Sequence, residues 1–326
     1  MAQTRRRRRR RRLNPRFLVM VACLAVLLIL MIIGIVSCAN SNNNPNPDST
    51  TSSTDSEPTF GWMEEDGKRY YLNQDGTRPS GWLELDGKRY LLDAEGFVKP
   101  GWYEENGVTY YIREDGAMAT GTLRIDGTTY HFTSAGVPIL LVNPWNAVPE
   151  GYEPDLVSLG TDVSVEGSQV DRSCYDALMQ MIKDCNKECP QVCVVSSYRT
   201  HEYQTNSYNR KVQSYLDQGY SQADAEKEAA TIIAKPGTSE HQLGLAVDII
   251  DTRLWALEEE QETLPAQKWL MEHAWEYGFI LRYPKGKIEE TGIIYEPWHY
   301  RYVGKEVAKE LHDSGQTLEA YLLSLS

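Results

Sequence analysis

Residues 239–249 read SEHQLGLAVDI, and this stretch places a histidine and an aspartate seven positions apart around a glycine. Gly244 and the apolar run that follows it predict a turn that leads into a buried strand. Asp248 interrupts this run, and a carboxylate buried there needs a partner because an unpaired buried charge is costly. His241 lies just before the turn and can approach Asp248 from the loop.

A second polar stretch, residues 295–302, reads YEPWHYRY. Pro297 keeps Glu296 out of regular helix and favours an extended backbone. If residues 298–303 form a strand, alternate side chains face opposite sides of it. One side then carries His299, Arg301 and Val303, and the other carries Trp298, Tyr300 and Tyr302.

His241, Asp248 and His299 together offer two imidazoles and one carboxylate. This ligand set suits Zn²⁺ with an open fourth position for water, and Glu296 would stand beside that water. Other hydrolase signatures are missing from the sequence. Thr205 stands where H-E-x-x-H needs its second histidine, and neither S-x-x-K nor K-T-G occurs.

The charge of the chain is divided unevenly. The first sixteen residues hold nine of the 33 basic side chains, Arg5 through Arg12 and Arg16, and no acid. The remaining 24 basic residues face 46 acids, which gives the rest of the chain a net charge of roughly 24 − 46 = −22. Because nucleic acid is itself a polyanion, this acidic body argues against a nucleic-acid partner.

Residues 17–36 contain twenty consecutive residues without a charge, enough to span a bilayer as a helix. We expect a cytoplasmic Arg-rich segment over 1–16 and a transmembrane anchor or signal segment over 17–37. No Lys or Arg follows until Lys68, so the positive-inside rule predicts a single-pass protein of the cell membrane with extracellular C-terminal domains. The residues up to Cys38 read IVSC and resemble a bacterial lipobox, so a lipoprotein attached there is the alternative.

A linker and a repeat region follow. Residues 38–59 are dominated by Asn, Ser, Thr, Pro and acids, which predicts a disordered linker. Residues 60–140 repeat with a period of twenty, and the copies begin at Gly61, Gly81, Gly101 and Gly121. Each copy, the weaker fourth included, contains an Asp-Gly or Asn-Gly pair between short aromatic runs, which predicts a two-residue hairpin. Because one hairpin cannot bury its own apolar face, we expect the copies to stack into an all-β solenoid.

The repeated pattern G-W-x4-G-x2-Y-Y resembles the cell-wall-binding repeats of the choline-binding and glucan-binding type. The resemblance implies aromatic cages for a wall polymer (choline, teichoic acid or glucan), since indole and phenol faces attract cations and pack on sugar rings. The predicted ligand-binding residues are Trp62, Tyr70, Tyr71, Trp82, Tyr90, Trp102, Tyr110 and Tyr111. Alternatively, many of these aromatics are simply the core of a thin solenoid. Thr122 and Leu91 replace repeat aromatics, which argues against complete cages at those positions.

Residues 141–326 mix helical and strand patterns and predict an α+β domain. Helices are predicted over Ser173–Glu188, from Ser221 to a stop at Pro236-Gly237, and over Pro265–Tyr277 with an end at Gly278. The β-branched run Val192–Ser196 predicts a strand between the first two of them.

Four cysteines of this region, Cys174, Cys185, Cys189 and Cys193, lie close together in the sequence. An extracellular location favours disulfides among them. Cys174 and Cys185 are too far apart along the predicted helix for one bond, and Cys193 is better placed to reach Cys185 or Cys189. A four-cysteine zinc site is the alternative, although the paired C-x2-C spacing is missing.

Three motifs resemble the VanY-type D-alanyl-D-alanine carboxypeptidases, zinc peptidases of the D-Ala-D-Ala metallopeptidase/hedgehog-like fold. They are SSYRT at 196–200, S-x-H-x6-D at 239–248 and E-P-W-H at 296–299. The resemblance implies an α+β zinc peptidase domain over 141–326. It assigns zinc binding to His241, Asp248 and His299, the catalytic base to Glu296, and substrate and oxyanion binding to Arg199. Ser239, Gln204 and Trp298 are further candidates for contacts with the substrate.

The function expected from these features is zinc-dependent removal of the terminal D-Ala from peptidoglycan stem peptides by an enzyme tethered to membrane and cell wall. An L,D-carboxypeptidase that acts on tetrapeptide stems is the first alternative, because the same zinc machinery serves both reactions. A catalytically inactive wall-binding protein is the second. The two-histidine, one-carboxylate set could also bind iron, but an extracytoplasmic peptidase favours zinc.

Overall fold

The computed structural model describes residues 60–106, 108–189 and 191–325. Its C-terminal part is built around a four-stranded antiparallel sheet in the order β12-β13-β15-β14. The strands are β12 (Val192–Ser196), β13 (Ala246–Asp251), β14 (Phe279–Leu281) and β15 (His299–Tyr302). The register of the two central strands sets Asp248 directly opposite His299. Directly opposed residues of neighbouring strands share one face of the sheet, so these two side chains meet.

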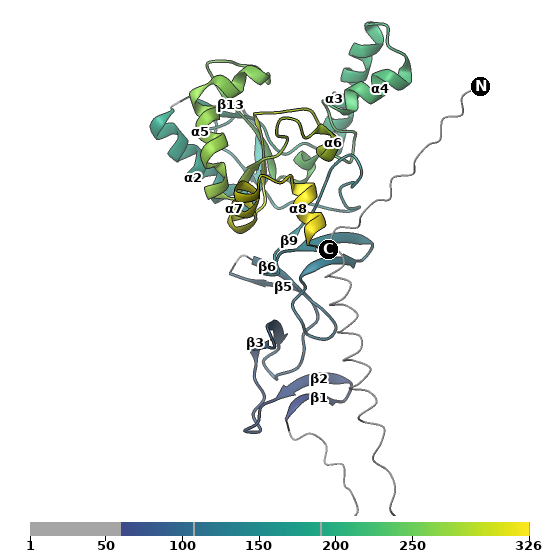
Figure 1. Ribbon diagram of the computed structural model, residues 1–326, viewed down its shortest axis with the longest axis vertical. Helices are drawn as coiled ribbons and strands as arrows, with labels where there is room; N and C mark the ends of the chain where they lie inside the picture. The colour runs from purple at the N-terminus through teal and green to yellow at the C-terminus, as the bar shows by residue number, and fades with distance from the viewer. Residues whose placement is uncertain (1–59, 107, 190, 326) are drawn as a thin grey trace, which may run out of the picture. The chain divides into compact units, whose positions relative to one another are not determined.

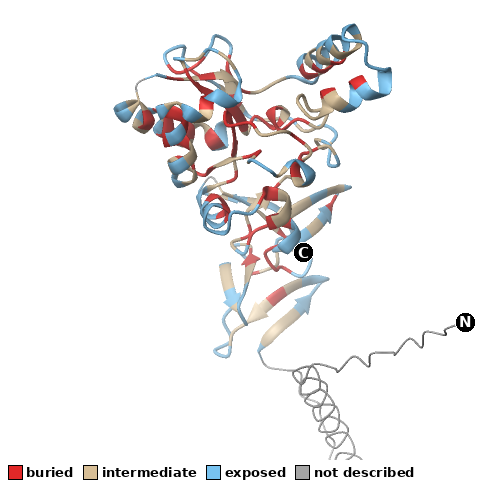
Figure 2. Ribbon diagram, turned by 45° about the horizontal axis from the view of Figure 1, so that its top comes forward, coloured by how far each residue is buried: buried red, intermediate tan, exposed pale blue. Residues whose placement is uncertain are grey.

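Helices α2 (Arg172–Glu188) and α5 (Pro265–His273) lie against this sheet (Figure 1). The buried side of α2 carries apolar residues three and four positions apart, Cys174, Leu178, Met181, Ile182 and Cys185. They form the main core with residues of the sheet that include Val194, Val247, Ile249 and Tyr300. The buried residues between these layers are visible in Figure 2.

The other elements of this part surround the sheet. They are β10 (Leu156–Ser158), β11 (Gln169–Asp171), α3 (His201–Asp217), α4 (Gln222–Ala230), η1 (Glu240–Leu243), η2 (Glu259–Thr263), η3 (Ala274–Tyr277), α6 (Ile288–Thr291), α7 (Lys305–Ser314) and α8 (Leu318–Ser324). Helices α3 and α4 pack on each other through a small cluster of their own. Helices α7 and α8 enclose a further cluster, to which Ile139 at the end of the repeats contributes.

The repeats form hairpins, as predicted. Their strands are β1 (Gly61–Glu65), β2 (Lys68–Leu72), β3 (Gly81–Leu85), β4 (Lys88–Leu92), β5 (Gly101–Glu105), β6 (Val108–Ile112), β7 (Gly121–Ile125), β8 (Thr128–Phe132) and β9 (Pro138–Ile139). The first turn residue of each hairpin has a φ of 47–53°, the left-handed conformation that Asp and Asn tolerate. Successive copies are joined through the backbone, for example by the N–H of Val98 to the carbonyl of Arg69 at 2.8 Å.

Two predicted helices are shorter than expected. The helix opened by Ser221 ends at Ala230 rather than near Pro236, because the following residues turn back toward α3, where the side chain of Gln204 donates to the carbonyl of Ala234 at 2.7 Å. The predicted helix Pro265–Tyr277 is α-helical only to His273 and continues as the 3-10 turn η3. A tightened last turn of this kind is common at helix ends.

The expected membrane location is corrected here. The predicted transmembrane segment, residues 17–37, lies outside the described residues, as do the predicted cytoplasmic segment 1–16 and linker 38–59. Among the residues that the structure describes, no helix has the length and apolar character needed to cross a bilayer. The prediction of a single-pass location in the cell membrane is therefore wrong for this part of the chain. The alternative attachment through Cys38 also lies outside it.

The expected disulfides are not present among the four described cysteines, all of which are free thiols. Cys174 and Cys185 are fully buried in the core, where burial raises the pKa of both thiols to about 12. They therefore act as small apolar core residues. The four cysteines also do not form a metal-binding group in the described part of the chain, which removes the alternative of a four-cysteine zinc site.

Gly244 sits at the turn between η1 and β13 with a φ of 72°. A Cβ atom there would lie 2.9 Å from the backbone nitrogen of Asp171. We expect Gly244→Ala to lower the free energy of unfolding by roughly 2–4 kcal/mol, because left-handed strain and a backbone clash add together. Gly286→Ala is the control, since Gly286 has a φ of 74° and open space around it. Equal losses for the two variants in chemical denaturation would contradict a role for the clash.

Candidate metal centre and active site

The three predicted ligands come together in the structure. His241 lies on η1, and Asp248 and His299 face each other across β13 and β15. All three are buried, and a ligand atom from each lies within 4.8 Å of the others. The rings of His241 and His299 stand nearly perpendicular to each other, with centroids 4.9 Å apart.

His241 is held with one ring nitrogen free for a metal. Its Nδ1 lies 2.7 Å from the carbonyl oxygen of Ser197. Because a carbonyl only accepts, Nδ1 carries the proton and Nε2 is the unprotonated nitrogen. Nε2 lies 3.3 Å from Oδ2 of Asp248. Burial, together with the nearby charge of Arg199, lowers the pKa of His241 to about 4, so the imidazole is neutral at pH 7.

Asp248 is the buried carboxylate between the two histidines. Its Oδ2 accepts from Nη2 of Arg199 at 2.6 Å, and its Oδ1 lies 3.0 Å from Nδ1 of His299. Burial alone would raise the pKa of Asp248, but His241 and Arg199 hold it well below its usual range. The aspartate is therefore ionised, as a metal ligand must be.

His299 lies among carboxylates. Burial alone would lower the pKa of His299, but its interactions with Asp248 and Glu240 raise it to about 9. In the absence of a cation, a proton on this ring offsets the nearby negative charge. A metal ligand has to be neutral imidazole, so a divalent ion takes over the role of that proton.

Glu296 stands next to this group. One of its carboxylate oxygens lies 3.6 Å from Nδ1 of His299, and its side chain is only 10% exposed. Burial raises the pKa of Glu296 to about 8, against the opposing charge of His299. A carboxyl group whose pKa is near the working pH can both take up and release a proton.

The described residues fit a zinc ion. Two imidazole nitrogens and one carboxylate oxygen converge, which is the donor set of many catalytic zinc sites. No other group of three or more metal-ligating side chains occurs among the described residues.

A cleft of roughly 260 Å³ opens onto the three ligands. Glu296 and the other predicted polar contacts, Arg199, Ser239 and Gln204, line it together with Trp298. Oε1 of Gln204 is buried and has no hydrogen-bond partner among the residues that the structure describes, so it can accept from a ligand. The sequence did not point to two other lining residues, Tyr203 and Tyr283, because neither lies in a recognisable motif.

The repeat aromatics gather in three groups, each built from two successive copies. The groups are Trp62, Tyr71 and Tyr90; Trp82 and Tyr110 with Leu91 in the third place; and Trp102, Tyr111 and Tyr130. Tyr130 was not predicted, although it lies twenty residues after Tyr110 and the period identifies it. Tyr70 belongs to none of the three and instead packs against Phe97 and Arg78.

Two of these groups contain a cation of the chain itself. The guanidinium of Arg69 lies 4.2 Å from the ring centroid of Trp62, and that of Arg89 lies 4.1 Å from the ring centroid of Trp82. In the third copy the equivalent position is Thr109, and among the described residues no lysine or arginine lies over Trp102. The Trp102 side chain is 44% exposed, and with Thr109 it borders a cavity of roughly 530 Å³.

The antiparallel sheet and its surrounding helices form the fold of a VanY-like zinc peptidase, preceded by β-hairpin repeats. The family model for D-alanyl-D-alanine carboxypeptidases matches residues 167–305, and a solved VanY structure that is 39% identical is covered over 97% of its chain, so this chain belongs to the VanY family. The model for a putative cell wall binding repeat matches residues 61–77 and 101–118.

Individual relatives agree with this assignment. A D-alanyl-D-alanine carboxypeptidase of Enterococcus faecalis is 40% identical over 184 residues, which are 56% of this chain and 65% of that protein. The chain thus matches just under two thirds of that relative's length. A crystal structure of the vancomycin resistance D,D-pentapeptidase VanY in complex with Zn(II) is 39% identical, with 56% of this chain and 97% of that chain covered and a TM-score of 0.50. The structure of the LD-carboxypeptidase LdcB is 34% identical, with 64% and 95% covered and a TM-score of 0.53.

The solved VanY pentapeptidase holds Zn(II), which agrees with zinc dependence of the family. The sequence-based assignments to the VanY family and to zinc are confirmed. The roles of the individual site residues remain predictions.

Proposed function

We propose that this protein is a zinc-dependent D-alanyl-D-alanine carboxypeptidase that removes the terminal D-Ala from peptidoglycan stem peptides. The observation that carries the proposal is the convergence of His241, Asp248 and His299 in one cleft, with the buried Glu296 beside them. Membership of the VanY family supports it.

His241, Asp248 and His299 would hold the zinc ion in this reaction. Bound there, zinc polarises the scissile carbonyl and makes a water molecule acidic enough to react near neutral pH. Glu296 accepts the proton of the attacking water at its carboxylate and returns it to the leaving amine of D-Ala. Arg199 lines the same cleft and adds a positive charge for the carbonyl oxygen, on which negative charge develops.

The L,D-carboxypeptidase activity is the second candidate, and the similarity to LdcB favours it. The two activities differ in the residue that precedes the terminal D-Ala, so defined peptides separate them. We would incubate the zinc-loaded chain with a pentapeptide that ends in D-Ala-D-Ala and with the matching tetrapeptide, and measure released D-Ala. Preference for the pentapeptide supports the proposal, and preference for the tetrapeptide supports the second candidate. If zinc-loaded protein released D-Ala from neither peptide, the alternative of a catalytically inactive wall-binding protein would be supported.

The repeats are proposed to bind a cell-wall polymer, and the third aromatic group is the best candidate for a cationic or sugar component. Arg69 and Arg89 already cover ring faces of the first two groups, so a ligand there would have to displace a cation of the chain. The group of Trp102, Tyr111 and Tyr130 keeps an exposed indole, and none of the described lysines or arginines lies over its rings. Choline, teichoic acid and glucan remain the candidate ligands.

We expect Trp102→Ala to reduce retention on purified cell walls by roughly tenfold, because an aromatic contact with a cation or sugar contributes about 1 kcal/mol or more. Trp62→Ala is the matched control, since Trp62 occupies the same position two copies earlier but is covered by Arg69. Hydrolysis of a soluble peptide should be unchanged in both variants. Equal losses of retention would show that the arginine does not decide which group binds.

A further inference from the structure

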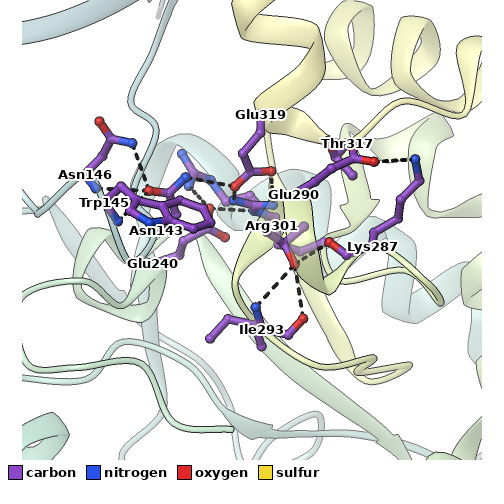
Figure 3. Close-up of polar contacts among 12 residues, drawn as sticks. Asn143, Trp145, Asn146, Glu240, Lys287, Glu290, Ile293, Arg301, Thr317 and Glu319 are labelled. Atoms are coloured by element: carbon purple, nitrogen blue, oxygen red, sulfur yellow. Dashed lines mark hydrogen bonds and ion pairs between the residues drawn. The ribbon is translucent and has the colours of Figure 1, made fainter. Parts of the chain in front are cut away.

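A chain of buried ion pairs connects Glu240, the neighbour of His241 in the sequence, with Glu319 on helix α8. Figure 3 labels Glu240, Arg301 and Glu319 of this chain. Glu240 stands at its centre, between Ser239 and His241 on η1, and its side chain is completely buried. Its Oε1 accepts from Nε of Arg282 at 2.8 Å and lies 2.9 Å from Nη1 of Arg301. One carboxylate oxygen of Glu240 is thus engaged by two guanidinium groups.

The other oxygen of Glu240 faces a metal ligand. Within the described part of the chain, neither Oε2 of Glu240 nor Nε2 of His299 has a hydrogen-bond partner, although both are buried. These two atoms lie 3.7 Å apart. A buried acceptor and a buried potential donor that lack any other partner and lie this close need only a small shift to form a hydrogen bond.

The orientation of the His299 ring determines which of its two nitrogens can bind a metal. Its Nδ1 lies 3.0 Å from Oδ1 of Asp248 and 3.6 Å from a carboxylate oxygen of Glu296, so it is the nitrogen turned toward these two groups. A histidine can present an unprotonated Nδ1 in its neutral form only if the proton resides on Nε2. The state of Nε2 therefore decides whether His299 can ligate a metal through Nδ1.

We propose that Glu240 is a positioning residue for the metal centre. Its Oε2 accepts the Nε2–H of His299, which fixes the ring and keeps Nδ1 free as the ligand atom. Carboxylate or carbonyl acceptors of this kind commonly orient metal-ligating histidines. The carbonyl of Ser197 holds His241 in the corresponding way through Nδ1.

The rest of the ion-pair chain holds Glu240 in place. Arg282 also donates to both carboxylate oxygens of Glu319 on α8, at 2.8 and 2.6 Å. Arg301 donates to the carbonyls of Leu140 and Tyr302. With its Oε1 fixed by two arginines, Glu240 has only Oε2 available for His299.

The first experiment uses the unaltered full chain and rests on zinc binding, not on the proposed peptidase activity. In ¹⁵N NMR of the imidazole nitrogens, we expect the zinc-loaded protein to show His299 with a proton on Nε2 and without one on Nδ1. A zinc-loaded His299 with its proton on Nδ1 would overturn the proposal. This measurement uses the parent protein, so it does not depend on the folding of a variant. Its result is also independent of whether the protein hydrolyses a peptide.

The second experiment compares two isosteric variants by competition with a zinc chelator. In Glu240→Gln the two arginines attract the amide oxygen, so the NH₂ group turns toward His299 and favours the wrong tautomer. We expect zinc affinity to fall by about 10- to 100-fold. Glu319→Gln removes a charge from the same buried chain without touching His299, and its zinc affinity is expected to stay within about threefold of the parent. Equal losses in the two variants, or none in Glu240→Gln, would overturn the proposal.

Discussion

Glu296→Gln is expected to lower kcat for D-Ala release by about 10²- to 10⁴-fold, the usual contribution of a positioned general acid–base group. The amide has nearly the same shape but cannot accept the proton of the attacking water. Because Glu296 is beside the three ligands and not among them, zinc content should remain at one ion per chain. Steady-state kinetics and metal analysis on the same preparation check both parts.

Glu289→Gln provides the control for this variant, because Glu289 is an exposed glutamate outside the cleft. The substitution makes the same chemical change outside the cleft, so the variant should retain the parent kcat. A Glu296→Gln variant that hydrolyses peptide at the parent rate would remove Glu296 from the mechanism. A variant that loses zinc as well would instead place the carboxylate among the ligands.

The metal site could be predicted because its information is local in the sequence. Gly244 lies at the turn before β13, and Pro297 lies in the turn that leads into β15, so in each motif a turn residue precedes the strand that carries a ligand. The pairing of Asp248 with His299 needed only that these two strands be neighbours, which the structure shows.

The surroundings of the site could not be predicted in the same way. Glu240 is 42 residues from Arg282, and Glu319 is 37 residues beyond that arginine, so no spacing connects them. Helix α3 was missed because its sequence, HEYQTNSYNRKVQSYLD, has few apolar residues, and the structure buries only Gln204, Tyr208 and Val212 of it. Its position is set by packing against α4, which is a tertiary effect.

In the repeats, the sequence predicts which aromatic residues are equivalent but not which of them are covered by a cation. The period of twenty fixes which aromatics are equivalent, and it would have identified Tyr130. It does not reveal that Arg69 and Arg89 turn their guanidinium groups onto the tryptophans of their own hairpins. Strand alternation places Arg69 on the same face as Trp62, but arginine on a hairpin surface points to solvent as readily as to a ring. The distinction between covered and open aromatic groups therefore required the structure.

Asp248→Asn is expected to remove zinc binding almost completely. The change takes away the only negative charge among the three ligands, so the loss of zinc affinity should exceed the ~100-fold upper range found for residues that merely support a ligand. Peptide hydrolysis should fall with it at any ordinary zinc concentration. Because zinc stabilises only a chain that binds it, thermal unfolding gives a readout independent of activity. Zinc should raise the Tm of the parent and leave that of the variant unchanged.

The stability of the metal-free variant needs its own control, because Asp248 also pairs with Arg199. Breaking a buried ion pair costs about 3–5 kcal/mol, and Arg199 remains partly exposed, so the loss should lie near the lower value. Asp251→Asn is matched to it: Asp251 is buried on the same strand and pairs with Arg253, but it lies outside the ligand group. It should lose stability and keep the full response to zinc. If zinc raised the Tm of Asp248→Asn as much as that of Asp251→Asn, Asp248 would not be a ligand.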